Sequence, residues 1–352
     1  MRRAAWTLAL ASAVGLALAA PAHGRAPQES CAVCHGAEGL QLGRSVHGRA
    51  GILCTSCHGG VAGRLDETAH GDGVLPLDEP LGAVEYCGGC HSDQARMRVA
   101  GLRTDQLSLY WSSRHGARLR EDGDANVATC VSCHGAHDVL DSRDPRAPSH
   151  PLRVAETCGT CHADAELMAR YDLTTRPVED YLGSVHARAL LGEGHLSSPS
   201  CADCHGAHGA APPKVLEVER VCGQCHSQIR EDFDRSPHYA AALAGEMQEC
   251  TSCHGSHAVA EPTADLFVGS AEGHCGSCHG AADDPGARMA ARLHAGLAQF
   301  EDTVRGAEEA LASAAAQGLF IDREHGYVDD ARALLIPARP STHALSADAL
   351  DE

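Results

Sequence analysis

The chain has 352 residues, of which only two Trp, six Tyr and four Phe are large aromatics, whereas 18 are Cys and 24 are His. A domain of this length usually builds its core from many more aromatic side chains, so the composition predicts that something other than protein fills part of the interior. Lys and Arg number 28 against 47 Asp and Glu, which gives a net charge of −19. This balance argues against a nucleic-acid-binding protein, which needs a basic surface.

Residues 1–22 have the pattern of a secretory signal peptide. Arg2 and Arg3 precede an apolar run over residues 4–20, and the small residues around Ala20-Pro21-Ala22 offer a cleavage site. An uncleaved membrane anchor is the alternative, although the run is short for one. Cleavage after Ala22 would remove both arginines and make the mature chain more acidic. No later stretch has the length and apolarity of a membrane span, so we expect an exported protein, in the periplasm or outside the cell.

Every cysteine belongs to one repeated pentad, C-x-x-C-H, which occurs nine times. The cysteines are Cys31, Cys34, Cys54, Cys57, Cys87, Cys90, Cys130, Cys133, Cys158, Cys161, Cys201, Cys204, Cys222, Cys225, Cys250, Cys253, Cys275 and Cys278. The histidines that close the pentads are His35, His58, His91, His134, His162, His205, His226, His254 and His279.

C-x-x-C-H is the attachment motif of c-type haem. Two thiols at this spacing can each form a thioether with a haem vinyl group, and the adjacent His is then held under the iron as its proximal ligand. Nine copies that use every cysteine predict nine covalently bound c-type haems. The haems would supply the buried apolar area that aromatic side chains usually provide, so the chain should not fold without them.

Three other interpretations of the pentads explain less. Structural zinc would need the C-x-x-C pairs to combine two by two, but nine is an odd number and the following His would have no role. A disulfide framework gives no reason for that His. A thioredoxin-type redox site lacks the alternating strands and helices that surround it.

The pentads alternate between two sequence contexts. Those at odd positions mostly read C-G-x-C-H, whereas those at even positions read C-x-[SD]-C-H-G and are each preceded by Ser-x-His. Serine at this position is typical of a helix N-cap, which places each of these histidines in the first turn of a helix. Three even pentads carry a second His three residues after the first. This second His cannot reach the opposite face of its own haem, so it must serve a neighbouring haem or none.

Nine further histidines are predicted as distal haem ligands. Four come from Ser-x-His, three from His-Gly-x-His, one from the helix after the ninth pentad and one from a Gly-rich loop: His47, His115, His186, His238, His137, His208, His257, His294 and His70. Five others are predicted to be surface residues: His150, His195, His274, His325 and His343. Met97 or Met168 could ligate instead, but packing against haem explains both. With His on both faces, the irons should be low-spin and low in potential.

The second pentad departs from the pattern, because it reads His58-Gly-Gly-Val61 and lacks the second His. This local unit has to rely on something like His70, whose ligand need not serve the same haem, because the pattern passes ligands between neighbours. If any haem has an open face, we therefore expect it to be the one attached through Cys54, Cys57 and His58.

The predicted fold is mainly α-helical and irregular, a haem-packed multihaem cytochrome with little or no sheet. The signal peptide over residues 1–22 would be followed by a nine-haem domain over residues 23–284 and a haem-free helical segment over residues 285–352. In that segment, apolar residues recur every three or four positions from Met289 to Leu311, which predicts a long helix that ends near Gly318. A shorter helix from about Val328 should stop before Pro337. Together they predict a helical hairpin that packs on the last haem or, alternatively, offers a docking surface.

From Cys31 to His294, the alternation of Ser-x-His and C-x-x-C-H-G-x-His resembles the exported multihaem c-type cytochromes of the doubled CxxCH type. That family includes the pentahaem electron donor of periplasmic nitrite reductase and the decahaem components of outer-membrane conduits. The resemblance implies electron transfer through closely spaced bis-His haems. One alternative is a multihaem reductase that acts on a nitrogen or sulfur oxyanion at one open haem. The nitrite-reductase variant C-x-x-C-Lys is absent, since Lys214 is the only lysine, and no catalytic residue is predicted. A subunit of an extracellular cytochrome filament is a second alternative.

The predicted partners are redox proteins. The acidic chain and the haem propionates should attract a basic docking surface, and the encounter should weaken with added salt. Nucleic acid is not an expected partner. Association with a membrane complex or with further copies of the chain remains open.

Overall fold

The computed structural model describes residues 30–346 except 72, 76, 78, 214–217 and 282. The predicted signal peptide lies outside these residues. The chain divides into two compact units, Met1–Leu75 and Pro76–Glu352. Among the described residues, helices are the regular elements and no strand forms; one isolated antiparallel bridge joins Gly59 and Val74. The predicted mainly helical, irregular fold is confirmed. No helix in the described ranges has the length and apolarity needed to cross a membrane.

The first unit consists of very short helices around the first two pentads. They are α1 (Cys31–Cys34), α2 (Gly36–Arg44), α3 (Val46–Arg49), α4 (Cys54–His58) and the 3₁₀ turn η1 (Glu67–His70). Ser45 caps α3, because its buried hydroxyl accepts a hydrogen bond from the Gly48 N–H at 3.0 Å and donates to the Leu42 carbonyl at 2.7 Å. Asp66 caps η1 by accepting from the Thr68 N–H at 3.0 Å.

The second unit begins with two copies of one supersecondary arrangement, in which matched positions differ by 71 residues, as from Pro80 to Pro151. The first copy comprises α5 (Pro80–His91), α6 (Gln94–Ala100), α7 (Gln106–Ser112), α8 (Arg114–Ala117), the π-helical turn η2 (Arg118–Asp122) and α9 (Cys130–His134). The second comprises α10 (Pro151–His162), α11 (Ala165–Ala169), α12 (Arg176–Leu182), α13 (Val185–Ala187), η3 (Arg188–Gly192) and α14 (Cys201–His205). Because of this repeat, the third and fourth pentads are the same number of residues apart as the fifth and sixth pentads.

Each copy is organised around one buried tyrosine. The Tyr110 hydroxyl donates to the Ala128 carbonyl at 2.9 Å, and Tyr181 donates to the Pro199 carbonyl at the same distance. Burial raises the pKa of both tyrosines to about 12, so both stay protonated donors at neutral pH. The apolar clusters around them are small. Their buried members are Val84, Tyr110 and Leu119 in one copy and Ala155, Tyr181 and Ala187 in the other. Clusters of this size leave much of each interior to be filled by another group.

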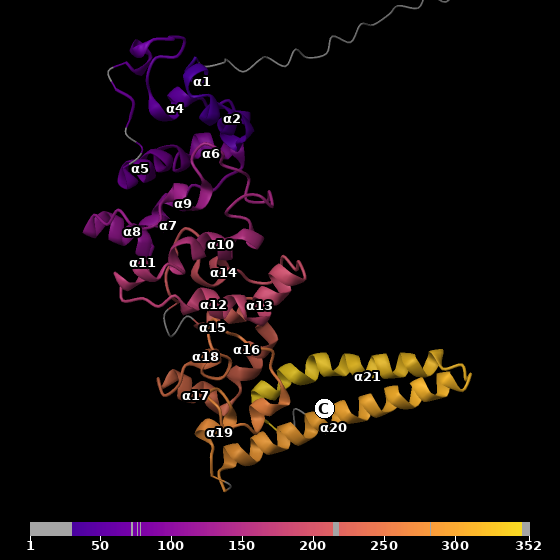
Figure 1. Ribbon diagram of the computed structural model, residues 1–352. Coiled ribbons are helices and arrows are strands. Elements are labelled where there is room, and N and C mark those ends of the chain that lie inside the picture. The colour runs from indigo at the N-terminus through magenta and orange to yellow at the C-terminus, as the bar shows by residue number, and fades with distance from the viewer. Residues whose placement is uncertain are drawn as a thin grey trace, which may run out of the picture. The chain divides into compact units, whose positions relative to one another are not determined.

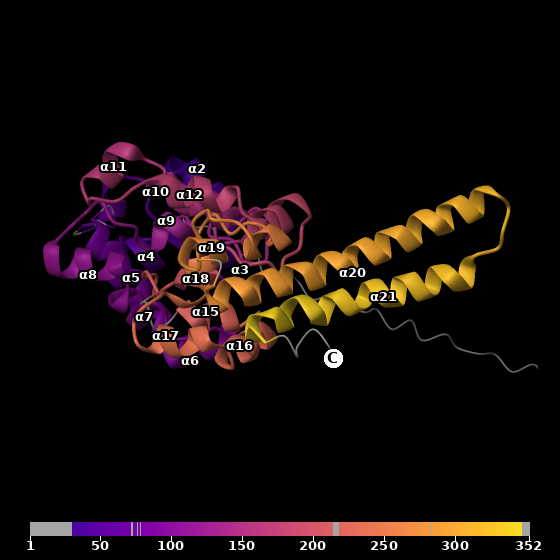
Figure 2. The same ribbon diagram turned by 90° about the horizontal axis from the view of Figure 1, so that it is seen from below.

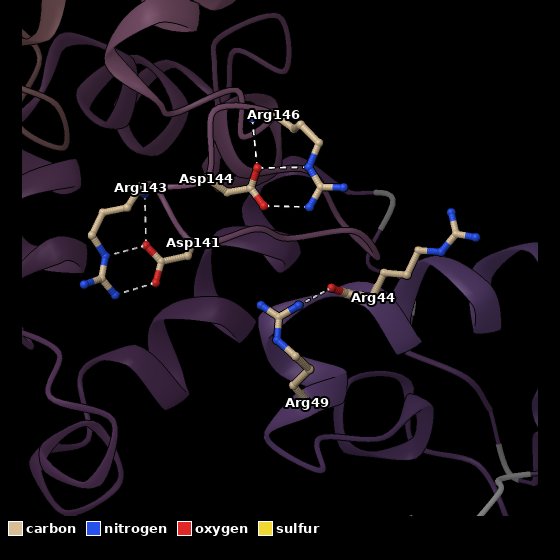
Figure 3. A network of polar contacts seen from close by, with 6 residues as sticks. All are labelled: Arg44, Arg49, Asp141, Arg143, Asp144 and Arg146. Atoms are coloured by element: carbon tan, nitrogen blue, oxygen red, sulfur yellow. Dashed lines mark hydrogen bonds and ion pairs between the residues drawn. The ribbon is translucent and has the colours of Figure 1, made fainter. Parts of the chain in front are cut away.

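The loop from α9 to α10 is stiffened by two aspartate–arginine turns. Asp141 accepts from the Arg143 N–H and from its guanidinium, and Asp144 does the same with Arg146, with donor–acceptor distances of 2.7 to 3.0 Å (Figure 3). The loop ends at His150, which is 6 % exposed and whose Nδ1 accepts from the Leu152 N–H at 3.3 Å. The prediction that His150 is a surface residue is therefore wrong: it is a buried cap at the start of α10.

The rest of the haem-attachment region contains α15 (Val218–Gly223), α16 (Ser227–Asp234), α17 (Pro237–Leu243), α18 (Glu249–His254), η5 (Ala264–Phe267) and α19 (Cys275–Cys278). Within the second unit, the attachment helices follow one another in chain order: α5, α9, α10, α14, α15, α18 and α19 (Figure 1). Neighbouring attachment helices are in contact along this series, as α5 is with α9, α10 with α14, and α15 with both α14 and α18.

The second unit ends in a helical hairpin, α20 (Pro285–Ala316) and α21 (Asp322–Ser341), followed by the 3₁₀ turn η6 (Thr342–Ala344). The two helices lie side by side and project away from the other helices of the unit (Figures 1 and 2). α20 ends close to Gly318, where the sequence predicted. α21 differs from the prediction, because it starts before Val328 and continues through Pro337 and Pro340. Its packing along α20 and against α16 maintains the helix where proline alone would end it.

Candidate functional site

The even pentads form one-turn helices whose ends are fixed by their own sequence. The residue before the second Cys accepts a hydrogen bond from the backbone N–H just before the first Cys: Ser56 from Leu53 at 3.2 Å, Ser132 from Thr129 at 3.0 Å, and Asp203 from Ser200 at 2.8 Å. The glycine after the His adopts φ of 70° to 80° in all four, a conformation that favours glycine. The motif C-x-[SD]-C-H-G is thus a capped and sharply terminated turn that holds two thiols and one imidazole together.

The third and fifth pentads end the twelve-residue helices α5 and α10, whereas the first and ninth form the four-residue helices α1 and α19. α5 and α10 both begin with proline and carry the C-G-x-C-H sequence in their last turns. Gly88 in α5 is packed so closely that a Cβ atom there would lie 2.6 Å from Leu107 of α7. The glycine of C-G-x-C-H therefore permits close contact with the next helix, at least in this copy.

Seven pentad histidines face a second histidine ring from elsewhere in the chain. The pairs and their ring-centre separations are His35–His70 at 6.4 Å, His162–His115 at 6.1 Å, His134–His208 at 6.0 Å, His226–His186 at 6.4 Å, His205–His257 at 5.9 Å, His254–His343 at 6.0 Å and His279–His238 at 6.0 Å. These separations are too long for stacking in direct contact, and they recur across different parts of the fold.

The separation matches one metal ion between two imidazoles. A metal–nitrogen bond of about 2 Å on each side, plus about 1 Å from each nitrogen to its ring centre, gives about 6 Å. No group of three or more Cys, His, Asp or Glu residues is arranged to hold a metal ion in the part of the chain that the structure describes. Two facing histidines beside two cysteines suit haem iron, since the porphyrin supplies the other four nitrogen ligands. The residues present therefore fit c-type haem.

Five of the seven pairs obey two rules of sequence position. In three odd pentads, the distal ring comes from the preceding Ser-x-His: His115 faces the fifth pentad, His186 the seventh and His238 the ninth. In two even pentads, it comes from the His-Gly-x-His of the next even pentad, as His208 faces the fourth and His257 the sixth. His208 and His257 thus each serve another pentad, as their short spacing requires.

Serine caps hold the Ser-x-His ligands. Ser113, which is 1 % exposed, accepts from the Gly116 N–H at 2.9 Å and donates to the Tyr110 carbonyl at 2.6 Å. Ser184 accepts from the Ala187 N–H at 3.1 Å. Both confirm the predicted N-cap, and each places its His in the first turn. Ser236 starts α17 before Pro237 without a side-chain cap, and its buried hydroxyl has no hydrogen-bond partner.

Several rings are further oriented through Nδ1. The His279 Nδ1 lies 2.9 Å from Asp284 Oδ1, the His343 Nδ1 lies 2.9 Å from the Pro340 carbonyl, and the His205 Nδ1 lies 3.1 Å from the Ala211 carbonyl. With a carboxylate or carbonyl as acceptor, Nδ1 carries the proton and Nε2 is left for the metal. Burial also lowers the pKa of nine rings, which favours the neutral form that binds metal. These are His91, His115, His162, His186, His208, His238, His254, His257 and His343.

The cysteine sulfurs show which attachment sites are neighbours. The thiols of Cys87 and Cys130 hydrogen-bond, and this contact lowers the pKa of Cys87 to about 7. The same contact joins Cys158 to Cys201, and Cys222 to Cys250. These sulfurs would form the thioethers to bound haem, so each contact would bring two attachment sites together. The pairs are the third with the fourth pentad, the fifth with the sixth, and the seventh with the eighth.

Electrostatic effects between thiols link these pairs to one another. Burial is the largest cause of the raised pKa of Cys133, Cys204 and Cys253. A smaller effect comes from Cys161 on Cys133, from Cys278 on Cys253 and, after Asp203 and Cys201, from Cys225 on Cys204. Together with the contact of α14 with α15 and the order of the helices in Figure 1, these effects place the fourth pentad near the fifth, the sixth near the seventh and the eighth near the ninth. Within the second unit, the order of attachment sites in space follows their order in sequence.

The predicted distal ligands do not all lie where the sequence analysis placed them. His70, which lies in the second-pentad unit, faces His35 of the neighbouring first pentad. His294 lies half-buried in α20, and no ring contact in the described part of the chain involves it. His343, predicted to be a surface residue, faces His254 instead. The remaining nominated residues His47, His58, His91 and His137 also make contacts with other groups.

One signal in the sequence could have found His343. The segment Ser341-Thr342-His343 repeats the Ser-x-His pattern of the other ligands. Its serine is the last residue of the long helix α21 and precedes only the short turn η6, and its hydroxyl donates to the Ala338 carbonyl at 2.8 Å. Two predicted surface histidines, His195 and His325, are exposed.

A family model described as the doubled CXXCH motif matches residues 194–231, which contain the sixth and seventh pentads. Neither the comparison with curated proteins nor the comparison with solved structures found a match. The matched segment and the paired histidine rings support a haem-binding, c-type multihaem cytochrome-like protein with a role in electron transfer.

Proposed function

We propose that the protein transfers electrons along a series of nine covalently bound c-type haems, each with two axial histidines. The observation that carries this proposal is the set of seven facing histidine pairs. Each pair contains a pentad histidine, and its ring-centre separation of 5.9 to 6.4 Å leaves room for one iron between the two imidazoles. When bound, haem supplies a one-electron Fe(III)/Fe(II) couple at each site.

The chain's part in this function is to position the haems and to fill both axial positions. The sulfur contacts, such as that of Cys158 with Cys201, bring neighbouring haem edges together within the second unit. Two histidines at an iron leave no coordination position for a substrate, so the paired sites favour electron transfer over catalysis. Two imidazole ligands also favour a low potential, since it is Met in place of His that raises it.

The acidic charge supports a basic redox partner. The net charge of −19 would be made more negative by the propionates of nine haems and by loss of Arg2 and Arg3 with a signal peptide. We propose that the protein is exported, to the periplasm or the cell exterior, and meets cationic surfaces there. Electron transfer to such a partner should slow as ionic strength rises, because salt screens the attraction. A rate that is independent of salt would contradict this part of the proposal.

The direct test is the mass of the purified mature chain. We expect the polypeptide plus nine haems, and an N-terminus that begins after Ala22. A mass with fewer haems, or a cooperatively folded chain without any, would contradict the proposal. Oxidised protein with high-spin iron would point to a reductase, and fibres in electron micrographs would point to a filament subunit.

A further inference from the structure

The eighth pentad does not receive a distal ligand by the rule that supplies the fourth and sixth pentads. The fourth pentad is served by His208 after the sixth, and the sixth by His257 after the eighth. By the same rule, the eighth would take a ligand from a His-Gly-x-His after a further pentad, and the segment between His279 and His343 contains no such pentad. Among the described residues, His254 faces a ring from outside the repeat instead.

His343 stands in that position. Its ring centre lies 6.0 Å from that of His254, with an angle of 28° between the ring planes. The other even-pentad pairs have separations of 5.9 and 6.0 Å and angles of 11° and 14°. The Nδ1 of His343 is committed to the Pro340 carbonyl at 2.9 Å, which leaves Nε2 for a metal. The pair therefore repeats the geometry of its class with a ligand from a different part of the chain.

The hairpin fixes where His343 falls. Arg339 of α21 pairs with Glu301 of α20 at 2.9 Å, and Arg332 pairs with Glu308. Glu308 follows Glu301 by seven residues in α20, and Arg332 precedes Arg339 by seven residues in α21. Both ion pairs therefore fit the same antiparallel register of the two helices. A slip of one helical turn would move His343 by about 5 Å, too far to share an iron with His254.

The end of the hairpin is also held against the rest of the second unit. α21 and η6 both contact α16. Thr342, next to His343, is 5 % exposed, and Asp232 of α16 is 2 % exposed and lies close enough to act electrostatically on His343. Leu345 then adopts φ of 49°, a left-handed conformation that is unusual for leucine.

We propose that α20, α21 and η6 form a ligand-delivering arm, in which His343 is the distal ligand of the iron held by His254. This assignment rests on the proposed haem function and deepens it. The arm explains why a haem-free hairpin follows the last pentad: it returns the chain to the eighth pentad and closes the one even site that the repeat leaves incomplete. When His343 is absent, this iron becomes a site for a small exogenous ligand such as cyanide or imidazole.

The test compares three variants of the full-length, haem-loaded protein: His343→Ala, His294→Ala and His325→Ala. Mass spectrometry first establishes the haem number, and electron paramagnetic resonance then counts high-spin irons. We expect His343→Ala to retain nine haems and to show one high-spin iron that binds cyanide and returns to low spin with added imidazole. His294→Ala and the exposed control His325→Ala should stay low-spin throughout.

A second variant covers the case in which His343→Ala does not accumulate. His343→Met keeps a ligand at the position and should raise the potential of a single haem. Nine low-spin haems in His343→Ala, or a high-spin iron in His294→Ala, would contradict the assignment of His343 as the distal ligand of the His254 iron. Either result would leave the electron-transfer proposal intact. A wild-type protein without covalent haem would instead overturn the proposed function itself.

Discussion

His70 and His343 both lie outside the repeating ligand pattern, but they reach their proximal partners by different routes. His70 is on the four-residue turn η1, close in sequence to its partner His35, and both residues are exposed. His343 follows a hairpin of two long helices, and both His343 and His254 are half-buried. The ring planes meet at 81° in the first pair and at 28° in the second.

The comparison indicates what each end of a ligand-exchanging repeat requires. Odd pentads take a ligand from a preceding Ser-x-His, a motif that is not found just before the first pentad, and even pentads take one from the His-Gly-x-His of the next even pentad, a motif that is not found between the eighth pentad's own and His343. A short loop closes the first gap and a long hairpin closes the second. We expect the two closures to differ in how readily they open, because an exposed turn unfolds locally at lower free energy than a packed helix end.

The largest effect should come from withholding haem altogether. The apolar clusters of three buried residues in each repeat are too small to maintain the helices around the pentads. A chain expressed without haem attachment should therefore show no cooperative thermal unfolding in either unit. Circular dichroism during heating measures this. A sharp thermal transition in the haem-free chain would show that the polypeptide has a sufficient core of its own.

Removal of each end ligand should open one iron. His70→Ala and His343→Ala should each give one high-spin iron, and the double variant should give two, because the sites lie in separate units and share no partner. Electron paramagnetic resonance of the oxidised proteins provides the count. If His70→Ala keeps every haem low-spin, His70 is a surface residue and its pairing with His35 has no role in ligation.

In the wild-type protein, the two closures should differ in ligand exchange. We expect cyanide to enter at the His35 site roughly tenfold faster than at the His254 site, which corresponds to about 1.4 kcal/mol in the free energy of opening. Stopped-flow absorbance, with His70→Ala and His343→Ala to assign the phases, measures both rates. Equal rates would mean that exposure does not control access to these irons.

A smaller effect should follow from loss of the cap at η1. Asp66→Ala removes the acceptor of the Thr68 N–H and should cost about 1 kcal/mol locally. Cyanide entry at the His35 site should then accelerate about fivefold, with no change at the His254 site. Asp66→Asn retains an acceptor at the same position and should restore most of the wild-type rate.

The smallest effect should come from the arm's ion pair. Arg339→Gln breaks the contact with Glu301, but both side chains are largely exposed, so the loss should be below about 1 kcal/mol. Cyanide entry at the His254 site should rise less than about fivefold, and high salt should reduce the difference from the wild type. A fully open His254 site in this variant would show that the ion pair, rather than packing on α16, positions the arm.

The sequence was sufficient for features that are local in the chain. The pentads, the serine caps at Ser113 and Ser184, and the need for His208 to serve a neighbour all follow from spacing and from residue type. Spacing and residue type do not determine which neighbouring pentad His208 serves, because that depends on how successive attachment helices stack. The end ligands were the hardest to place, because His70 lies in neither motif and the Ser-x-His of His343 is not followed by a pentad as the others are.

The hairpin shows this limit most clearly. Pro337 predicts the end of a helix, but packing on α20 and α16 carries the helix to Ser341 and delivers His343. His294 was favoured because it follows the ninth pentad closely, yet closeness in sequence does not decide which ring crosses to which haem. The repeated Ser-x-His at 341–343 was a usable signal that lay beyond the expected end of the helix.

The most direct measurement is a count of low-spin and high-spin iron in the oxidised, full-length protein after mass spectrometry has fixed the number of haems. We expect nine haems and nine low-spin irons, because each pentad histidine should share its iron with a second histidine. A protein with nine haems and one or more high-spin irons would contradict the bis-His assignment and would favour a reductase with an open haem.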